Sequence, residues 1–390
     1  MRINQWFEQR KNEMSLVALM AYLGDSRATD ERDRVYSLLG AAKEAHLVKQ
    51  LDLSWTVEEV YKALVKSFIQ EYDSLDIICY SHVFNSSARR EDNRRTLPSW
   101  VPDWRVHVEG KAMTVMASQG SKEGTGNFRP AAVMESKAMY KASGEKLPAC
   151  KISEDLLITS GINVDRIDGL GVSTHNDAGR IINSRYKLLL EQPTSRYNSQ
   201  LDQSRSSTST LIETISRCLA LDRPDRYLAE YMSPNLFLDD FLKLCKSYFS
   251  DPRKENPPRY FREWFDGNKA LRIQGRSLEE RCQEASLHTP LIGWRDLTRG
   301  SPKQFHTRIQ DTVVNMARRL VVTDKGYLGM AASRARKGDL VCVLYGCSIP
   351  VLLREVAGGR FEFIGECYLD GFMDGEAIKK GLGEVQFRIV

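Results

Sequence analysis

The chain has 390 residues, of which 42% are hydrophobic and 27% are charged. These values are ordinary for globular proteins and exclude a collagen-like, disordered or coiled-coil chain. The longest apolar stretch, 341–353, is interrupted by glycine, serine and proline, whereas a membrane-spanning helix needs about 20 apolar residues. The first residues lack the apolar core of a signal peptide. We therefore expect a cytoplasmic protein of two or three domains with no membrane segment.

The net charge of +5 comes from one stretch of the chain. Residues 251–319 contain 14 basic and 9 acidic residues, so the rest of the chain is balanced. Four aromatic residues at 260–265 are interleaved with the basic residues of this stretch, which is one feature of nucleic-acid-binding surfaces. However, acidic residues are mixed into the same stretch, as is typical of the exposed side of helices. We therefore favour a solvated helical surface, with nucleic-acid binding by 251–319 as an alternative.

The eight cysteines and six histidines show no spacing typical of a metal site. No two cysteines form a CxxC pair, although zinc ligands usually come in such pairs. Without a secretory signal we expect buried, reduced thiols rather than disulfides. The sequence also lacks a Walker A loop, a GxGxxG fingerprint, a GxSxG elbow and an HExxH helix. We therefore expect neither a metal nor another cofactor.

Two short helices are expected near the N-terminus, over 14–23 and 30–40, because apolar residues recur there at helical spacing. In the second, Thr29 or Asp30 would cap the first turn, and Gly40 would end the helix. Three carboxylates crowd this first turn, where the positive end of the helix dipole stabilises their ionised form. A catalytic acid needs the opposite, a raised pKa, so a structural role is favoured. These carboxylates belong to Asp30, Glu31 and Asp33.

The clearest expected helix covers 56–72. Thr56 and Glu59 form a capping-box pattern at its start, and apolar residues then recur at helical spacing without a gap. The apolar run that follows, 75–80, is short enough to be either a strand or a last helical turn.

A segment rich in proline and tryptophan, LPSWVPDW, occupies 97–104. Pro98 and Pro102 fix the backbone and remove hydrogen-bond donors, so an extended strap is expected. Trp100 and Trp104 could form an aromatic platform for a ligand, but large aromatic residues also anchor a chain by burial. We favour a strap that is anchored to the preceding helices.

The middle of the chain divides by composition. Residues 106–193 show a weak mixed pattern, in which 155–167 is typical of one or two strands with a bulge or turn at Gly161. Residues 194–210 are polar and rich in serine, as in flexible insertions. Residues 211–317 have a mostly helical pattern.

The last region, 318–390, changes to the period of β-strands. Residues 318–330 are expected to form a hairpin with Asp324, Lys325 and Gly326 in its turn. Regularly spaced short strands then follow, which indicates a small antiparallel β-barrel. The expected fold is therefore α+β, mainly a helical platform that includes 1–105, with a small C-terminal antiparallel β-barrel that strands from 151–168 could join.

Few residues are candidates for catalysis. Asp374 and Glu376 lie with Asp370 in the segment LDGFMDGEA, where carboxylates at this density could hold a divalent cation. The spacing differs from that of an EF-hand loop, and Asp–Gly pairs are typical of turns. If the chain were instead a hydrolase with a site where its regions meet, Asp103, Asp374 and Glu376 would have to converge in one pocket.

Several segments resemble, in content and order, parts of fungal heterokaryon-incompatibility (HET) proteins. ATDERDRVYSLLG, LDLSWTVEEVYKALVKSFI and LPSWVPDW are similar to the region that follows the effector domain of that family. The run from RRLVVTDKGYLGM to GECYLDGFMDGEA is similar to its C-terminal region. The resemblance is close over 15–105 and 318–378. The positions that carry it are Asp30, Asp33, Arg34, Tyr36, Gly40, Pro98, Trp100, Pro102, Asp103, Trp104, Gly326, Gly338, Asp339, Gly371, Met373, Asp374, Gly375 and Glu376.

The resemblance implies that the family's activity belongs to an N-terminal effector domain with a TIR-like α/β fold. The segment before Asp30 is too short for such a domain, so we expect the accessory region alone: a truncated paralogue, the product of a split gene or a stand-alone regulator. The implied role is non-catalytic regulation of self/non-self recognition and programmed cell death through a protein partner. The carboxylate hydrolase and the nucleic-acid binder stay as alternatives.

Overall fold

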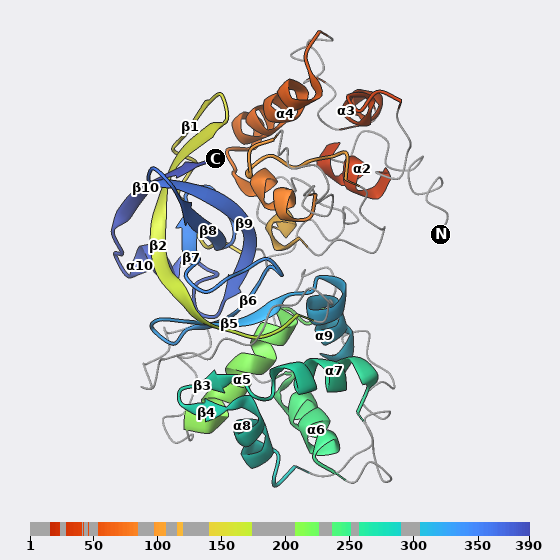
Figure 1. Cartoon of the computed structure of the whole chain (residues 1–390), viewed down its shortest axis with the longest axis vertical. Helices are drawn as coiled ribbons and strands as arrows, with labels where there is room; N and C mark the ends of the chain where they lie inside the picture. Colours follow the sequence, from red (N-terminus) through yellow and green to blue (C-terminus); the bar gives the residue numbers. More distant parts are fainter. Residues whose placement is uncertain are drawn as a thin grey trace.

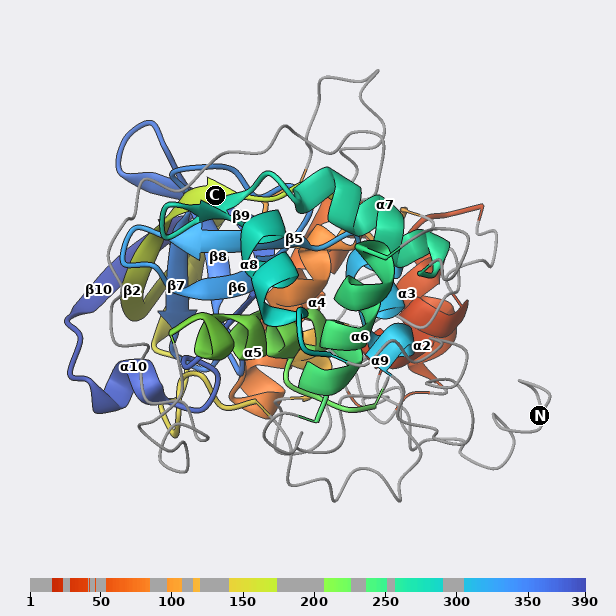
Figure 2. The ribbon, with the colours of Figure 1, turned by 90° about the horizontal axis from the view of Figure 1, so that it is seen from below.

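The computed structural model describes residues 16–23, 29–40, 42, 46, 54–84, 97–106, 115–119, 140–173, 207–225, 236–250, 257–289 and 305–390. These parts mix helices with a largely antiparallel sheet that is formed mainly by the C-terminal region. Figure 1 shows the sheet beside two groups of helices, α2 to α4 above and α5 to α9 below. Figure 2, which looks from below, shows the second group in front of α4.

The N-terminal helices are α2 (Leu16–Leu23), α3 (Asp33–Leu39) and α4 (Val57–Tyr72). The capping box predicted for α4 is confirmed, because Thr56 accepts from the Glu59 amide and Glu59 accepts from the Thr56 amide. These two bonds satisfy amides that have no partner within the helix.

The ends of α3 differ from the prediction. Its N-cap is Arg32, which makes no side-chain capping bond. Asp30 instead accepts from the Arg32 amide at 2.9 Å, one turn before the helix. Gly40 does end α3, but with φ of −63°, so the left-handed freedom of glycine is not used there.

The apolar run after α4 forms a 3₁₀ helix, η2 (Asp76–His82), and a second short 3₁₀ helix, η4 (Met116–Gln119), lies against it. The strap is not extended as predicted. The Val101 amide donates to the Pro98 carbonyl and the Val106 amide donates to the Asp103 carbonyl, so 98–106 makes two turns. Proline keeps only the residue directly before it out of the helical region, which leaves residues 99 and 100 able to turn.

The sheet combines one hairpin from the middle of the chain with the C-terminal strands. Gly326, with φ of +84°, lies in the predicted hairpin turn between β5 and β6, which is confirmed. The strands are β1 (Cys150–Ser153), β2 (Leu156–Leu170), β5 (Arg319–Thr323), β6 (Leu328–Ala331), β7 (Leu340–Leu344), β8 (Val351–Val356), β9 (Arg360–Leu369) and β10 (Glu384–Ile389).

Strand β2 organises this sheet. Its first half pairs with β1 and β10, and its second half pairs with β7 and β5. From β5 the pairings continue through β6, β9 and β8 to β7. Gly161 does not form the predicted bulge, since the register is regular there. A Cβ at Gly161 would lie 2.6 Å from the Val343 carbonyl oxygen, so glycine permits the close approach of β7.

The second helical group contains α5 (Ser207–Ala220), α6 (Leu238–Tyr248), α7 (Arg259–Asn268), α8 (Leu278–Ala285) and α9 (Phe305–Ile309). A π-helical turn, η8 (Gln310–Asn315), continues α9, and the short strands β3 (Arg272–Ile273) and β4 (Arg276–Ser277) lead into α8. Aromatic side chains from α6, α7 and α9 form its core. The start of α5, 207–210, falls in the serine-rich segment, whose other residues lie outside the described ones.

In the described part of 251–319, most charges of α7 and α8 lie on helix surfaces, whereas five further charged residues are buried: Arg281, Arg308, Asp311, Arg318 and Arg319. Arg259 pairs with Glu263 at 2.7 Å, and Lys269 pairs with Asp266 at 2.9 Å. Both pairs are solvent-exposed and of mixed sign, as expected for a solvated helical surface. All eight cysteines are free thiols, and all except the half-buried Cys150 are buried.

Candidate functional site

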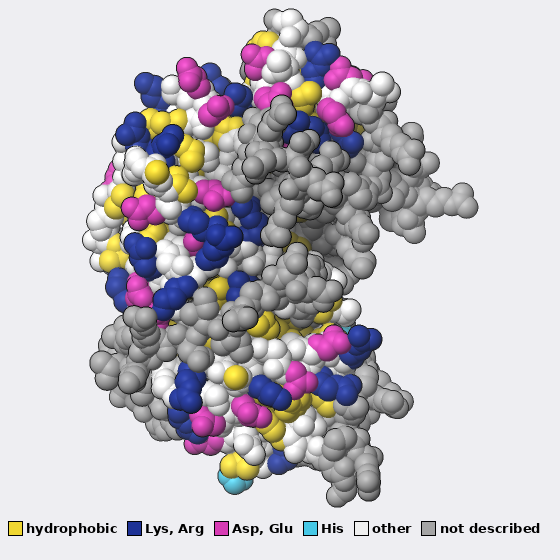
Figure 3. Space-filling view, in the orientation of Figure 1, with side chains coloured by type: hydrophobic (Ala, Val, Ile, Leu, Met, Phe, Trp, Pro, Cys, Tyr) yellow, Lys and Arg dark blue, Asp and Glu magenta, His cyan; other side chains and the backbone are white. Residues whose placement is uncertain are grey.

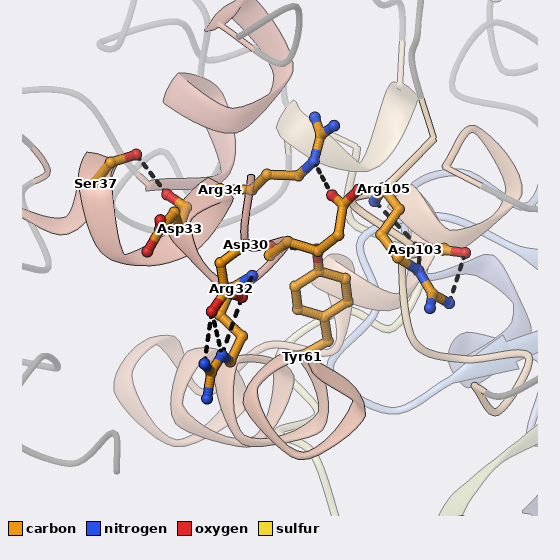
Figure 4. Close-up of polar contacts among 9 residues, drawn as sticks. Asp30, Arg32, Asp33, Arg34, Ser37, Tyr61, Asp103 and Arg105 are labelled. Atoms are coloured by element: carbon orange, nitrogen blue, oxygen red, sulfur yellow. Dashed lines mark hydrogen bonds and ion pairs between the residues drawn. The ribbon is translucent and has the colours of Figure 1, made fainter. Parts of the chain in front are cut away.

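The clearest grouping of motif residues lies where α3, α4 and the strap meet. Figure 4 shows Tyr61 between the Asp30–Arg32 pair and the Asp103–Arg105 pair. These residues come from parts of the chain that are far apart in sequence, and most of them are charged. We call this group the strap face. Its members are Asp30, Glu31, Arg32, Arg34, Glu58, Tyr61, Asp103 and Arg105.

On the α3 side, Asp30 and Arg32 form a compact ion pair. The Arg32 guanidinium donates to both oxygens of Asp30, with a shortest contact of 2.5 Å, and also donates to the Trp55 carbonyl at 3.0 Å. Hydrogen bonds from the side chain and backbone of Arg32 lower the pKa of Asp30 to about 2. The carboxylate therefore stays ionised at neutral pH, which excludes a role as a general acid.

Tyr61 connects α4 to this turn. Its ring is fully buried, and its hydroxyl donates to the Glu31 carbonyl at 3.0 Å. Burial raises the pKa of Tyr61, so the phenol keeps the proton that this bond requires. The Glu31 carboxylate pairs with Arg34, whose guanidinium thereby covers the start of α3.

On the strap side, Asp103 is held by its neighbour Arg105. The carboxylate accepts from the Arg105 amide at 3.1 Å and from Nε at 2.7 Å. Arg105 also reaches Glu58 of α4 at 3.4 Å. The Asp103 amide donates to the Phe84 carbonyl at 2.8 Å. Asp103 is thus a structural carboxylate that orients Arg105 toward α4.

The tryptophans of the strap are anchors. Trp100 is fully buried and donates to the Asp155 carbonyl at 3.1 Å. Trp104 is 3% exposed, and its ring centroid lies 4.5 Å from that of Phe84. Neither ring offers a free face, so the anchoring role is confirmed over the ligand platform.

The other two catalytic candidates lie elsewhere. Asp374 lies in the turn before α10 (Glu376–Lys379) and Glu376 is the first residue of that helix; the Glu376 carboxylate accepts from the Asp374 amide at 2.7 Å. Burial raises the pKa of Glu376. Figure 1 places α10 on the far side of the sheet from α4. No contact among the described residues joins Asp103 to this turn.

The remaining motif positions have local structural roles. Gly326, Gly338, Gly371 and Gly375 all have positive φ values between 78° and 94°, which other residues rarely adopt. Tyr36 is half-buried against the core. The following contacts complete the set: Asp339 with Arg354, the Met373 carbonyl with the Lys141 amide, and the Ser37 hydroxyl with the Asp33 carbonyl.

A set of buried ion pairs that the sequence did not predict lies where the second helical group meets the sheet. Arg217 pairs with Asp370 at 3.1 Å, and Arg318 pairs with Glu366 at 2.6 Å. All four side chains are at most 5% exposed. Asp370, considered above as a cation ligand, is therefore neutralised by an arginine. Periodicity could not reveal these pairs, because it treats every charged residue as exposed.

No helix within the described ranges has both the length and the apolar character needed to cross a membrane.

Comparisons with known proteins converge on one family. Residues 303–387 match the family model of the Het-6 beta-barrel domain. The chain is 22% identical over 393 aligned residues to heterokaryon incompatibility protein 6, OR allele, of Neurospora crassa. The alignment covers 93% of this chain but 51% of that protein, so the chain spans about half the length of its relative. No solved structure matches it. The domain match and the similarity together support a relationship between this chain and the fungal heterokaryon-incompatibility proteins.

Proposed function

We propose that this chain acts in fungal heterokaryon incompatibility as a non-catalytic cytoplasmic regulator that binds a protein partner through the strap face. Such binding would contribute to self/non-self recognition and to programmed cell death. The observation that supports this proposal most is that charged residues from α3, α4 and the strap lie together on one partly exposed face. The similarity to heterokaryon incompatibility protein 6 supports the biological setting.

The chemistry of the strap face favours recognition over catalysis. Each of its carboxylates is already bound by an arginine, so none is poised to take or give a proton. The side chains of these ion pairs range in exposure from 7% for Asp103 to 40% for Asp30. Ordered charges of both signs suit a complementary protein surface, where they set orientation and specificity.

We further propose that the sheet is the small barrel of this family and that β2 completes it. The pairing of β2 with both β5 and β7 supports this view. In this arrangement the helices of the N-terminal region form the platform that carries the strap face.

The test is a heterokaryon assay in a fungal strain from which the gene has been deleted. Wild-type chain should restore growth arrest on fusion with an incompatible strain. Arg105→Glu should abolish it, because the reversed charge repels Asp103 and Glu58. Glu58→Lys is a milder second variant. Arg259→Glu on α7 is the matched control, since it reverses one exposed, paired arginine outside the strap face.

Each variant is first checked by its thermal unfolding midpoint. If folded Arg105→Glu and Glu58→Lys proteins still arrest growth, the strap face is not the binding face. If the wild-type chain does not restore growth arrest with any incompatible strain, the proposed role in incompatibility is wrong. Turnover of NAD or of a nucleotide by the purified chain would contradict the non-catalytic assignment.

A further inference from the structure

A second charged surface surrounds the loop between β6 and β7. This loop, 332–339, carries three basic residues and lies against β2, β8 and β9. Figure 3 shows Lys and Arg side chains gathered over this part of the sheet. We call it the β6–β7 surface. Its basic members are Arg166, Arg334, Arg336, Lys337 and Arg354.

Two carboxylates of this region, those of Asp168 and Asp339, lie beneath its cations. The Asp339 side chain is 2% exposed and that of Asp168 is 6% exposed. By contrast, Lys337, which pairs with Asp168, is 34% exposed. Arg166 and Arg336 are also exposed. One carboxylate, that of Asp324, is exposed near Arg166 and Lys337. The exposed cations outnumber it, so the net charge of the side that faces solvent is positive.

A buried arginine adds to this positive field. Arg319 is 5% exposed and donates to the Gly171 carbonyl at 2.8 Å and to the Ala335 carbonyl at 2.9 Å. It has no carboxylate partner among the described residues. Burial lowers the pKa of Arg319 to about 10, so it is still charged at neutral pH. Its charge lies directly under the loop and is not cancelled there.

The loop is held in place before any partner arrives. Asp339 binds Arg354 through both oxygens, at 2.8 and 2.9 Å, and also accepts from the Arg336 amide at 2.7 Å. The Gly338 amide donates to the Ile167 carbonyl, and its carbonyl accepts from Arg166 at 3.0 Å. A partner would therefore meet a surface that loses little conformational entropy on binding.

Arg336 is the residue that we expect a partner to contact first. Its backbone is fixed by Asp339, while its exposed guanidinium has no carboxylate partner in the described part of the chain. A planar guanidinium can hold a carboxylate through two parallel hydrogen bonds. Lys337 lies next to it and can add a second charge.

We propose that the β6–β7 surface binds an acidic segment of a partner protein. The cations surround one loop rather than forming the long stripe that follows a nucleic-acid backbone. The large apolar side chains exposed in the described residues are all aliphatic, so the aromatic rings that stack on single-stranded bases are missing there. This inference does not depend on the strap face and adds a second contact surface to the chain.

The experiment measures fluorescence anisotropy of a labelled 15-residue poly-glutamate peptide with the purified full chain. The wild-type chain should bind this peptide, and binding should weaken as salt rises from about 50 to 200 mM. Arg336→Glu/Lys337→Glu should weaken it by about tenfold or more, because two attractive charges become repulsive. Arg259→Glu/Arg262→Glu on α7 makes the same change in net charge and should stay within about twofold of wild type.

Three outcomes would overturn the proposal. One is no binding of the peptide to the wild-type chain. Another is an equal loss in both double variants, which would mean attraction by net charge alone. The third is tighter binding of a 20-base-pair DNA duplex or of phosphatidylserine vesicles through Arg336 and Lys337, which would assign the surface to phosphates. If the double variant unfolds, the single variant Arg336→Ala replaces it in the test and should also weaken peptide binding. Arg105→Glu should bind the peptide normally, which separates this inference from the proposed function.

Discussion

Arg318 donates to Glu366 at 2.6 Å, although neither side chain is more than 1% exposed. Glu366 also accepts from the Ala117 amide at 2.8 Å through its other oxygen. One carboxylate of β9 therefore binds both the residue before β5 and the helix η4. Removing two charges from water is costly, and only close geometry with further hydrogen bonds offsets that cost.

Loss of one partner from this pair should be severe. We expect Glu366→Gln to lower the free energy of unfolding by about 3–5 kcal/mol, because Arg318 would be left buried without its counter-charge. Urea denaturation of the purified chain measures the change. Glu263→Gln, which breaks the exposed pair with Arg259, is the control and should cost less than about 1 kcal/mol. Equal costs would show that the buried pair has no special role.

Two glycines with similar backbone conformations should differ in their tolerance of alanine. Gly346 has φ of +83°, and a Cβ there would lie 2.3 Å from Cγ of Pro148. Gly358 has φ of +78°, but its nearest neighbour is 3.7 Å away. Gly358→Ala should cost only the left-handed strain of about 1–2 kcal/mol, whereas Gly346→Ala adds a clash. Thermal melts that rank the two variants in reverse would contradict this reading.

The buried carboxyl of Asp76 should make stability depend on pH. The pKa of Asp76 is raised from 3.8 to about 7, and burial is the largest cause of this shift. Because the folded-state pKa lies above the unfolded one, the stabilisation from the bound proton is complete below about pH 4 and is lost as pH rises through about 7. Asp76→Asn has no such proton to lose and can still accept from the Ser348 amide.

The variant should therefore gain stability relative to wild type as pH rises from about 4 to 7. Urea denaturation at several pH values measures this difference, in which the contributions of other titrating groups cancel. A difference that stays constant over the range would show that Asp76 titrates normally.

The anchoring role of Trp100 also predicts a magnitude. Trp100→Ala should lower the free energy of unfolding by about 3–5 kcal/mol, because a large buried ring is replaced by a cavity. Trp55→Ala is the matched control, since Trp55 is only partly buried against the same core. Denaturant titrations followed by circular dichroism compare the two. A smaller loss at Trp100 than at Trp55 would mean that the strap is not held by its tryptophan.

The parts of the fold that the sequence predicted are those encoded locally. Helix α4 follows from its capping box and its apolar spacing, and the β5–β6 hairpin follows from its turn residues. The prediction of an extended strap failed because proline restricts the backbone of the residue before it but not that of the two residues after it. The prediction for Gly161 failed because the reason for this glycine is the close approach of Val343, which lies on β7, far along the chain.

The candidate site was predictable only in part. The motifs single out Asp30, Arg34 and Asp103, but nothing in the sequence places these residues around Tyr61. Asp103 was a catalytic candidate because it is a carboxylate that directly follows a proline, whose backbone is rigid. Arg105, two positions further on, decides the role of Asp103 through three hydrogen bonds.

Strand β2 has a consequence for how the chain folds during synthesis. A ribosome makes residues 156–170 long before 319–389, so β2 leaves it with only β1 to pair with. A long strand with open edges is prone to aggregate. The edges of β2 stay open until its partner strands have been made, which is when nearly the whole chain is complete. A cut between 173 and 207 would leave β2 on one piece and β5, β7 and β10 on the other. Two such fragments, expressed together, would each hold what the other needs to close the sheet.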